Sequence, residues 1–364
     1  MKDTILSGKG KLVTVMVGKQ RLVGEGSKAH VLGGDLRSRF GLLVAWAATI
    51  LVFSLVAPHT FPRVSTFAGI LGSQAILVFL AVAVLFPLTA GDYDLSIGGT
   101  LSLSAMVLGI LNAQDHVTLG VAILAAAAVG VVVGAVNGFL VVKFKLDPFI
   151  VTLGMGTVLD GLALWSSNSN TITGVSQSLP QWTILYTVFK IPLAFYYGLF
   201  LVALAWYALE YTSFGRRLLY VGRGREVARL SGVAVGSSRA SAFVISGLAS
   251  ALAGVVYVGT TSSSTPGAGD SYLLPAYAAV FLGATAIKPG RFNSWGTLVA
   301  VYFLVTGITG LILIGANSYV QDLFYGGALI TGVVLSQLSQ RGATSTSRGH
   351  ASRLKGWVYH GRTR

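Results

Sequence analysis

The residues most able to do chemistry in this 364-residue chain are a few carboxylates and hydroxyls that interrupt long apolar stretches. Asp92, Asp94, Ser96 and Gly98 follow one another closely, and Asp160 is the one acid deep inside an apolar segment. Ionisable groups in apolar surroundings need water or protein partners, and they tend to mark solute pathways. We therefore expect these five residues to line a pathway for a polar solute.

Two of these acids also have a purely structural explanation. Asp94 precedes an apolar segment, where a carboxylate can cap a helix and interact favourably with its dipole. Asp160 is flanked by Leu159 and Gly161, and it could instead be a partly exposed residue near a helix end. The Gly-rich stretches at 90–99 and 283–291 are either broken backbone that is buried in protein or lines a cavity, or tight turns.

Other kinds of chemistry find no support in the residue types. The chain has no Cys, and its five His are scattered without the spacing of a metal site. It also lacks the G-x-x-x-x-G-K-[ST] loop that cradles ATP phosphates. We expect no metal, no cofactor and no enzymatic activity of its own in this chain.

The elements that must position these residues are apolar helices. Hydrophobic residues make up 53% of the chain and charged residues 10%, a balance that excludes an ordinary soluble domain. A helix needs about 20 apolar residues to cross a bilayer. Segments of about this length lie at 41–58, 64–90, 95–112, 117–141, 148–165, 191–209, 241–258, 272–287, 295–314 and 320–338. The sequence therefore predicts an all-α polytopic membrane protein with about ten transmembrane helices.

Almost all basic residues fall on one side of this series of helices. With a cytoplasmic N-terminus, 24 of the 26 Lys and Arg fall in cytoplasmic segments, and only Arg63 and Lys190 fall outside. This asymmetry is the one that the positive-inside rule describes. It predicts a multi-pass protein of the bacterial inner membrane with both termini in the cytoplasm. Because the charge lies in tails and loops, we expect contact with lipid and not with nucleic acid.

Composition divides the chain into three parts. Residues 1–39 are predicted to be a basic cytoplasmic extension, 40–340 the transmembrane domain, and 341–364 a basic cytoplasmic tail. The longest cytoplasmic loop is 211–240, in which residues 226–231 are expected to form a short helix ended by Gly232. This helix suggests docking of a cytoplasmic partner, and the alternative is a solvated loop that only fixes topology.

Small residues predict close helix packing. Gly130, Gly134 and Gly138 repeat at every fourth position of the fourth segment, which places them on one helix face. Such a stripe lets a neighbouring helix approach closely in a membrane. Gly residues in the fifth and ninth segments are expected to act in the same way.

Several ordered motifs resemble those of one family. Residues 91–98 resemble the G-x-x-D-L-S-[VI]-G motif of ribose-type ABC sugar permeases, which share a superfamily with branched-chain amino-acid permeases. Residues 137–141 with 148–154 are similar to that family's N-G-x-[LV]-V and P-F-I-[VA]-T-L-G. Residues 214–232 are similar to its G-R … G-x-N-x-x-A-A-x-x-S-G, and 245–254 to its I-S-G-x-x-[AS]-x-L-A-G.

The resemblance implies an import system in which this chain is the membrane-spanning permease for a pentose, hexose or similar small solute. The implied partners are a second permease chain in a homodimer, cytoplasmic ATP-binding subunits and an extracytoplasmic sugar-binding protein. Helices 2–5 and 7–10 run in opposite directions in the predicted topology, so we expect them to form an inverted repeat around the pathway. The residues implied in coupling to the ATPase are Gly215, Arg216, Gly222, Glu226, Ala228, Arg229 and Gly232.

The chain departs from this pattern at several positions. Gly224 stands where the family usually has Asn, and Val227 where it has Ala. Residues 288–291 replace a Gly-rich turn, and their Pro fixes φ and removes a donor. The alternative function is a secondary transporter or channel that works alone. A proton-coupled carrier, however, would be expected to show several buried acids or His on facing helices.

Overall fold

A computed structural model describes the backbone of residues 26–358 and the side chains of residues 39–338. The chain divides into two units, Met1–Arg37 and Ser38–Arg364, and the description below concerns the second. The predicted N-terminal extension lies almost entirely outside the described side chains, and so does the predicted tail.

The described backbone is mostly helical and its only strands are two residues long, which confirms the all-α class. The helices are α1 Gly26–Val56, α2 Val64–Ser73, α3 Ala75–Thr89, α4 Ile97–Gly109, α5 Leu119–Lys143, α6 Pro148–Ser166, α7 Ser178–Pro180, α8 Leu193–Tyr211, α9 Ser213–Arg223, α10 Arg225–Leu230, α11 Val235–Thr261, α12 Asp270–Gly283, α13 Ser294–Leu313 and α14 Tyr319–Val358. Two π-helical turns, Ile110–Gln114 and Gln181–Leu185, extend α4 and α7. Two-residue strands pair antiparallel, β1 Ile172–Thr173 with β4 Ser263–Ser264 and β2 Thr187–Val188 with β3 Ile191–Pro192.

Eight helical segments of the described chain are long and apolar enough to cross a membrane. The sequence predicts about ten, and the clearest difference is α12. This helix has 14 residues and not the 16 or so predicted for 272–287, which gives it a length of only about 21 Å. It ends at Gly283 because the side chain of Asn293 binds the turn that follows, donating to the carbonyl oxygens of Gly283, Ala286 and Arg291.

The core is built around α3 and α11. Every residue of α3 is buried, and α11 packs along it and against α5. The glycine stripe on α5 permits this contact, because a Cβ at Gly130 or Gly134 would collide with the backbone of Gly247 or Phe243 on α11. The predicted small-residue face is therefore a helix–helix contact.

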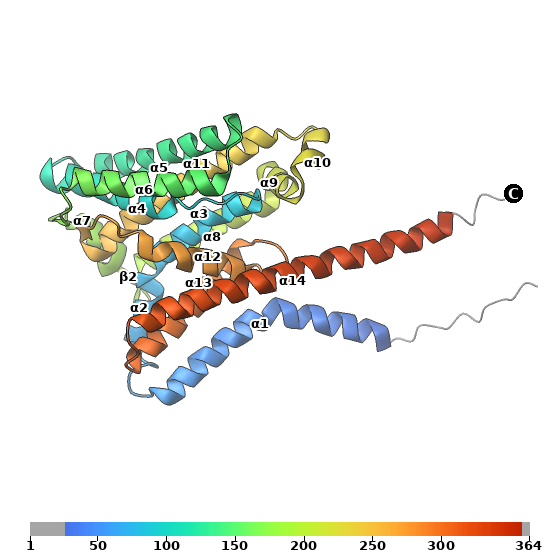
Figure 1. The fold of residues 1–364 in the computed structure, drawn as a ribbon. Helices are drawn as coiled ribbons and strands as arrows, with labels where there is room; N and C mark the ends of the chain where they lie inside the picture. The colour runs from blue at the N-terminus through green and yellow to red at the C-terminus, as the bar shows by residue number, and fades with distance from the viewer. Residues whose placement is uncertain (1–25, 359–364) are drawn as a thin grey trace, which may run out of the picture. The chain divides into compact units, whose positions relative to one another are not determined.

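The connections gather at two ends of the bundle (Figure 1). One end carries α9, α10 and the turn 284–293, which ion pairs from Lys288 and Arg291 to Glu210 tie to the end of α8. We call it the α9–α10 end. The opposite end carries α7 and the strands, where β1 and β4 join two long connections.

Two helices, α4 and α12, begin part-way along the bundle, where Gly269 lies against Gly98. The chain before α4 runs in extended form beside α12, so that Tyr93 stacks on Tyr277 at 6.3 Å between ring centroids. The chain before α12 runs beside α4 in the same way, from Ser264 next to Gly109 to Gly269 next to Gly98. The two helix starts therefore meet, and each is reached from a different end. This arrangement supports the inverted relation predicted for the two halves, and it explains why α12 is short.

Candidate functional site

The connection 90–96 between α3 and α4 is non-helical, with its polar side chains buried and with Gly91 and Tyr93 exposed. Gly91 has φ +77°, a left-handed conformation that glycine adopts without strain. Asp92, Asp94 and Ser96 are all buried. The first Gly-rich stretch is therefore broken backbone whose carboxylates and hydroxyl are buried in protein.

Asp94 is the centre of a buried hydrogen-bond cluster. Its Oδ1 accepts from the hydroxyl of Ser96 at 2.6 Å and from the Ser96 backbone N–H at 3.1 Å. Its Oδ2 accepts from the hydroxyl of Ser246 on α11 at 2.7 Å. Asn137 on α5 donates to the Ser96 hydroxyl at 2.8 Å, and the Asp94 N–H donates to the Tyr277 hydroxyl at 3.0 Å. Burial raises the pKa of the Asp94 carboxyl, and the hydrogen bonds from Ser96 and Ser246 oppose that rise.

Backbone contacts fix the start of α4. The Leu95 N–H donates to Thr152 Oγ1 on α6 at 2.9 Å. A Cβ at Gly98 would lie close to the Gly269 carbonyl, and the Gly269 N–H donates to the Ser102 hydroxyl at 3.1 Å. Gly98, predicted to line the pathway, is thus the point where α4 and the chain before α12 touch.

Asp92 faces away from Asp94, toward the α9–α10 end. Arg239 on α11 binds it with two hydrogen bonds, Nε to Oδ2 at 2.7 Å and Nη2 to Oδ1 at 2.8 Å. Arg225 at the start of α10 donates to Oδ1 at 2.6 Å. The two neighbouring acids, predicted to act together, therefore have separate surroundings.

Asp160 lies on the other side of the site, on α6. It is half-buried, next to the Ser102 hydroxyl and the carboxyl of Asp270, and its Oδ1 is buried with no hydrogen-bond partner among the described residues. The structure thus pairs Asp160 with the meeting point of α4 and α12 and not with Asp94. Sequence reasoning missed Asp270, because an acid that follows a Gly-rich stretch at a helix start has the appearance of an ordinary cap.

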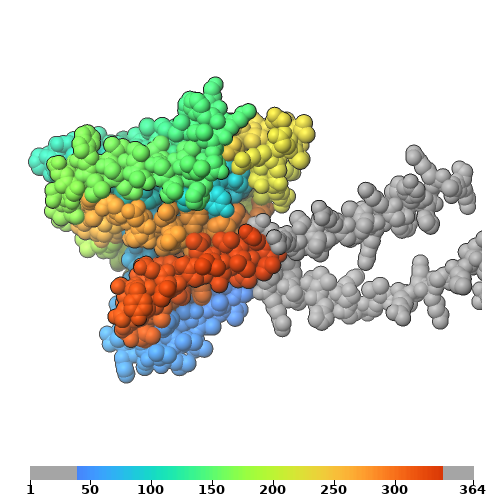
Figure 2. Space-filling model, viewed as in Figure 1, coloured from blue at the N-terminus to red at the C-terminus, as the bar shows by residue number. Residues whose placement is uncertain are grey.

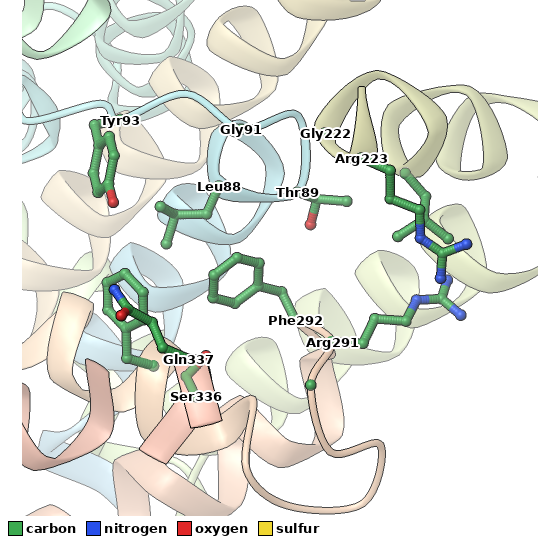
Figure 3. A pocket seen from close by; sticks show the side chains of 13 residues that line it. Leu88, Thr89, Gly91, Tyr93, Gly222, Arg223, Arg291, Phe292, Ser336 and Gln337 are labelled. Carbon is green, nitrogen blue, oxygen red and sulfur yellow. The ribbon is translucent and has the colours of Figure 1, made fainter. Parts of the chain in front are cut away.

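A cavity of about 310 Å³ opens at the α9–α10 end (Figure 3). Its walls combine the aromatic rings of Tyr93, Phe281 and Phe292 with the polar side chains of Arg223 and Gln337. Figure 3 shows the side chains of Arg223 and Arg291 along one edge, with Ser336 and Gln337 across the cavity. The Ser336 hydroxyl is buried and has no partner among the described residues.

A second cavity, of about 210 Å³, is lined by the other end of α12. Ser271, Tyr272 and Pro275 contribute to it, together with Gln74 and Gln321. Because α12 borders both cavities, the polar openings lie near the two ends of one short helix.

The α9–α10 segment, residues 212–234, consists of two short helices. Thr212 caps α9 by accepting from the Gly215 N–H at 3.3 Å. Gly224 separates α9 from α10, and Gly232 has φ +80° just after α10 ends at Leu230. The short helix predicted for 226–231 and its glycine end are confirmed. Helix α9 was not predicted, although Leu218 and Val221 give it a buried apolar face.

The residues predicted for coupling occupy different positions in this segment. Glu226 and Arg229 form an exposed ion pair at 2.7 Å, whereas Ala228 is buried against the bundle. Arg216 is exposed, and Gly215 and Gly222 touch the backbones of Leu209 and Thr89. The outer face of α10 instead presents apolar side chains, with Val227 70% and Leu230 83% exposed.

Comparison with known proteins identifies the family of this chain. A family profile described as "Branched-chain amino acid transport system / permease component" matches residues 66–333. The chain is 32% identical to the ribose import permease protein RbsC of Bacillus subtilis, over 87% of this chain and 98% of that protein. It is 30% identical to RbsC of Escherichia coli K12, over 82% of this chain and 93% of that protein.

More distant relatives transport other solutes. The D-allose transport system permease protein AlsC of Escherichia coli K12 is 27% identical, over 82% of this chain and 92% of that protein. No solved structure matches the chain. The family match covers well over half of the sequence, and the broken segment, the paired helix starts and the α9–α10 segment all fall within it. The chain is therefore a multi-pass membrane protein that belongs to the family of branched-chain amino acid transport system permease components.

Proposed function

We propose that this chain is the membrane-spanning permease subunit of an ATP-binding cassette importer that carries a sugar across the cytoplasmic membrane. A separate cytoplasmic subunit hydrolyses ATP and docks at the α9–α10 end. A binding protein delivers the solute at the opposite end. Ribose permeases at 30–32% identity and a D-allose permease at 27% identity are among its relatives, which supports a small polar sugar as the solute.

The observation that carries the proposal is the meeting of the α4 and α12 starts inside the bundle. Transporters with inverted repeats commonly place their substrate site where broken helices meet, because helix N-termini and freed backbone groups are available there. Here Ser102, Asp160 and Asp270 surround that meeting point, and Asp94 lies on the approach to it. Carboxylates and hydroxyls of this kind can bind the hydroxyl groups of a sugar.

The exposed face of α10 supports docking of an ATPase subunit. Val227 and Leu230 are large apolar side chains on a charged segment at the bundle end, flanked by the Glu226–Arg229 ion pair. Burying two such side chains in a partner contributes about 1.5–3 kcal/mol each. We call Glu226, Val227, Arg229 and Leu230 the docking surface.

A second permease chain fits the face formed by α6, α12 and α14, which Figure 2 shows as one continuous side of the molecule. Large apolar side chains of α6 and α14 are exposed, among them Ile150, Trp165, Leu323 and Ile330. A homodimer would cover them and enclose Asp160. In this arrangement the solute passes between two copies of the α4 and α12 starts.

Reconstitution tests the proposal. Proteoliposomes that contain this chain with its ATPase subunit and binding protein should accumulate ribose or allose only when ATP is supplied to the ATPase side. Omission of either partner should abolish uptake. Equal uptake by the permease alone, driven by an ion gradient, would instead identify a secondary transporter.

A further inference from the structure

Asp92 joins three parts of the permease through one carboxylate. It lies in the connection 90–96, and it binds Arg225 at the start of α10 and Arg239 near the start of α11. Three N–H groups of the two guanidinium groups donate to its two oxygens at 2.6–2.8 Å. Charge-assisted bonds of this length are strong, and the paired bonds from Arg239 also fix its orientation. The connection is thus tied directly to the docking surface's own helix.

The two arginines hold Asp92 in different ways. The Arg239 side chain is 12% exposed and makes two bonds, so it can neutralise the buried carboxylate without help. The Arg225 side chain is 44% exposed and makes one bond to Asp92 and one, at 3.0 Å, to the Gly91 carbonyl. Release of Arg225 would leave a neutral Asp92–Arg239 pair and move a half-exposed cation into water. Release of Arg239 would strand a buried charge, which is strongly unfavourable.

A backbone contact also joins the α9–α10 segment to the end of α3. Gly222 at the end of α9 packs directly on Thr89 and Ala90 at the end of α3, leaving no space for a Cβ. Two residues beyond Asp92, Asp94 contacts α11 and α12 through Ser246 and Tyr277. A displacement of α10 therefore reaches the approach to the α4 start through a few short contacts.

We propose that Arg225–Asp92 is a releasable latch that transmits movement of α10 to the broken segment 90–96, while Arg239–Asp92 is its permanent anchor. The latch is closed when α10 lies against the bundle and opens when the ATPase subunit draws α10 away. Opening frees the connection that carries Asp94, so that the pathway can change the end at which it is accessible. This inference rests on the proposed docking of an ATPase at α10, and it assigns coupling to a pair of residues outside the docking surface.

The test compares Arg225→Gln with Arg239→Gln and a matched control, Arg217→Gln. Arg217 is an exposed arginine on α9, and no ion pair involving it is found in the described part of the chain. Arg225→Gln should insert normally and bind the ATPase subunit as the wild type does, yet ATP-driven uptake should fall by about tenfold or more, in the range of a typical coupling energy. Arg225→Lys should recover part of the uptake. Arg239→Gln should lower membrane abundance, and Arg217→Gln should change neither property.

A second readout separates coupling from stability. Tyr93 is partly exposed and is adjacent to Asp92, so a single Cys placed there should react with a maleimide at different rates with and without ATP and vanadate. The rate difference should disappear in the Arg225→Gln background. The wild type must first bind the ATPase subunit and show ATP-driven uptake. If Arg225→Gln then shows the uptake of the wild type and an unchanged rate difference, the latch is overturned and the proposed function is not. Failure of the wild type to bind any ATPase subunit would overturn the proposed function and the latch with it.

Discussion

At the scale of single residues, Asp94 has more partners than a helix cap requires. One of its three accepted bonds comes from the Ser96 backbone N–H, as a capping carboxylate would show. The other two come from hydroxyl groups, one of them on α11 and distant in sequence. The structural alternative for Asp94 therefore accounts for only part of its surroundings, and the carboxylate also holds α4 against α11.

Substitution of Asp94 separates these contributions. Asp94→Asn keeps one carbonyl acceptor, and the Ser246 hydroxyl can rotate to accept from the new amide. Asp94→Ala leaves the hydroxyl hydrogens of Ser96 and Ser246 without their acceptor in a buried site, at a cost of about 1–3 kcal/mol for each. We expect loss of transport in both variants, with reduced membrane abundance only for Asp94→Ala. Normal transport by Asp94→Asn would reduce Asp94 to a structural residue.

The sequence shows Asp92 and Asp94 two positions apart, which predicts a shared role, but it does not predict their separate partners. Residues two apart on extended backbone point the same way in a regular strand; the turn at Gly91 and the entry into α4 break that rule and send the two carboxylates apart. Arg225 and Arg239 lie more than 130 positions away, as the separations of 133 and 147 show. Local pattern carries no information about such long-range contacts.

At the scale of elements, the glycine stripe on α5 was predicted as a contact face, while its partner α11 was not. Any helix with a small-residue face could have filled that role, because spacing defines a face and not a neighbour. The same limit applies to α12. Its apolar sequence predicted an ordinary membrane helix, and its early end depends on Asn293, which lies in the turn beyond it.

Valine substitutions on α5 test the glycine contact. Gly134→Val would press a side chain into the α11 backbone, and overpacking of this kind destabilises by about 1–3 kcal/mol. Gly120→Val, on the same helix, has open space around it and serves as the control. We expect a lower melting temperature in detergent for Gly134→Val than for Gly120→Val. Equal melting temperatures would show that α5 and α11 do not pack as described.

The docking surface makes its own prediction at this scale. Leu230→Ser should weaken binding of the ATPase subunit by about tenfold or more, since burial of a leucine contributes about 1.5–3 kcal/mol. Gly232→Val should act similarly, because valine strongly disfavours the left-handed conformation at φ +80°. Phe189→Ser, at an exposed position of the opposite end, is the control. Affinity in detergent measures both effects, and unchanged binding by Leu230→Ser would place the ATPase elsewhere.

At the scale of the whole molecule, the bundle is organised by the two helices that begin inside it. The sequence signals the start of α4 only by the Gly-rich stretch 90–99, which a turn would explain equally well, and the other Gly-rich stretch, 283–291, lies at the end of α12 and not at its start. The structure shows how far the two chain segments before α4 and α12 reach along the bundle. One enters from each end, and they meet where Gly98 touches Gly269. A solute pathway across the molecule then requires that these ends face different sides of the membrane.

The charge distribution predicts which end of the bundle faces the cytoplasm. The α9–α10 end carries the basic segments, so it should face the cytoplasm, with the β1–β4 end outside. Because the chain has no Cys, single cysteines report without background. Ser237→Cys, exposed near the start of α11, should react with an impermeant maleimide only after cells are permeabilised. Ser169→Cys, exposed in the connection after α6, should react in intact cells. Reaction of Ser237→Cys in intact cells would show that the α9–α10 end faces outside, where no cytoplasmic ATPase could bind α10.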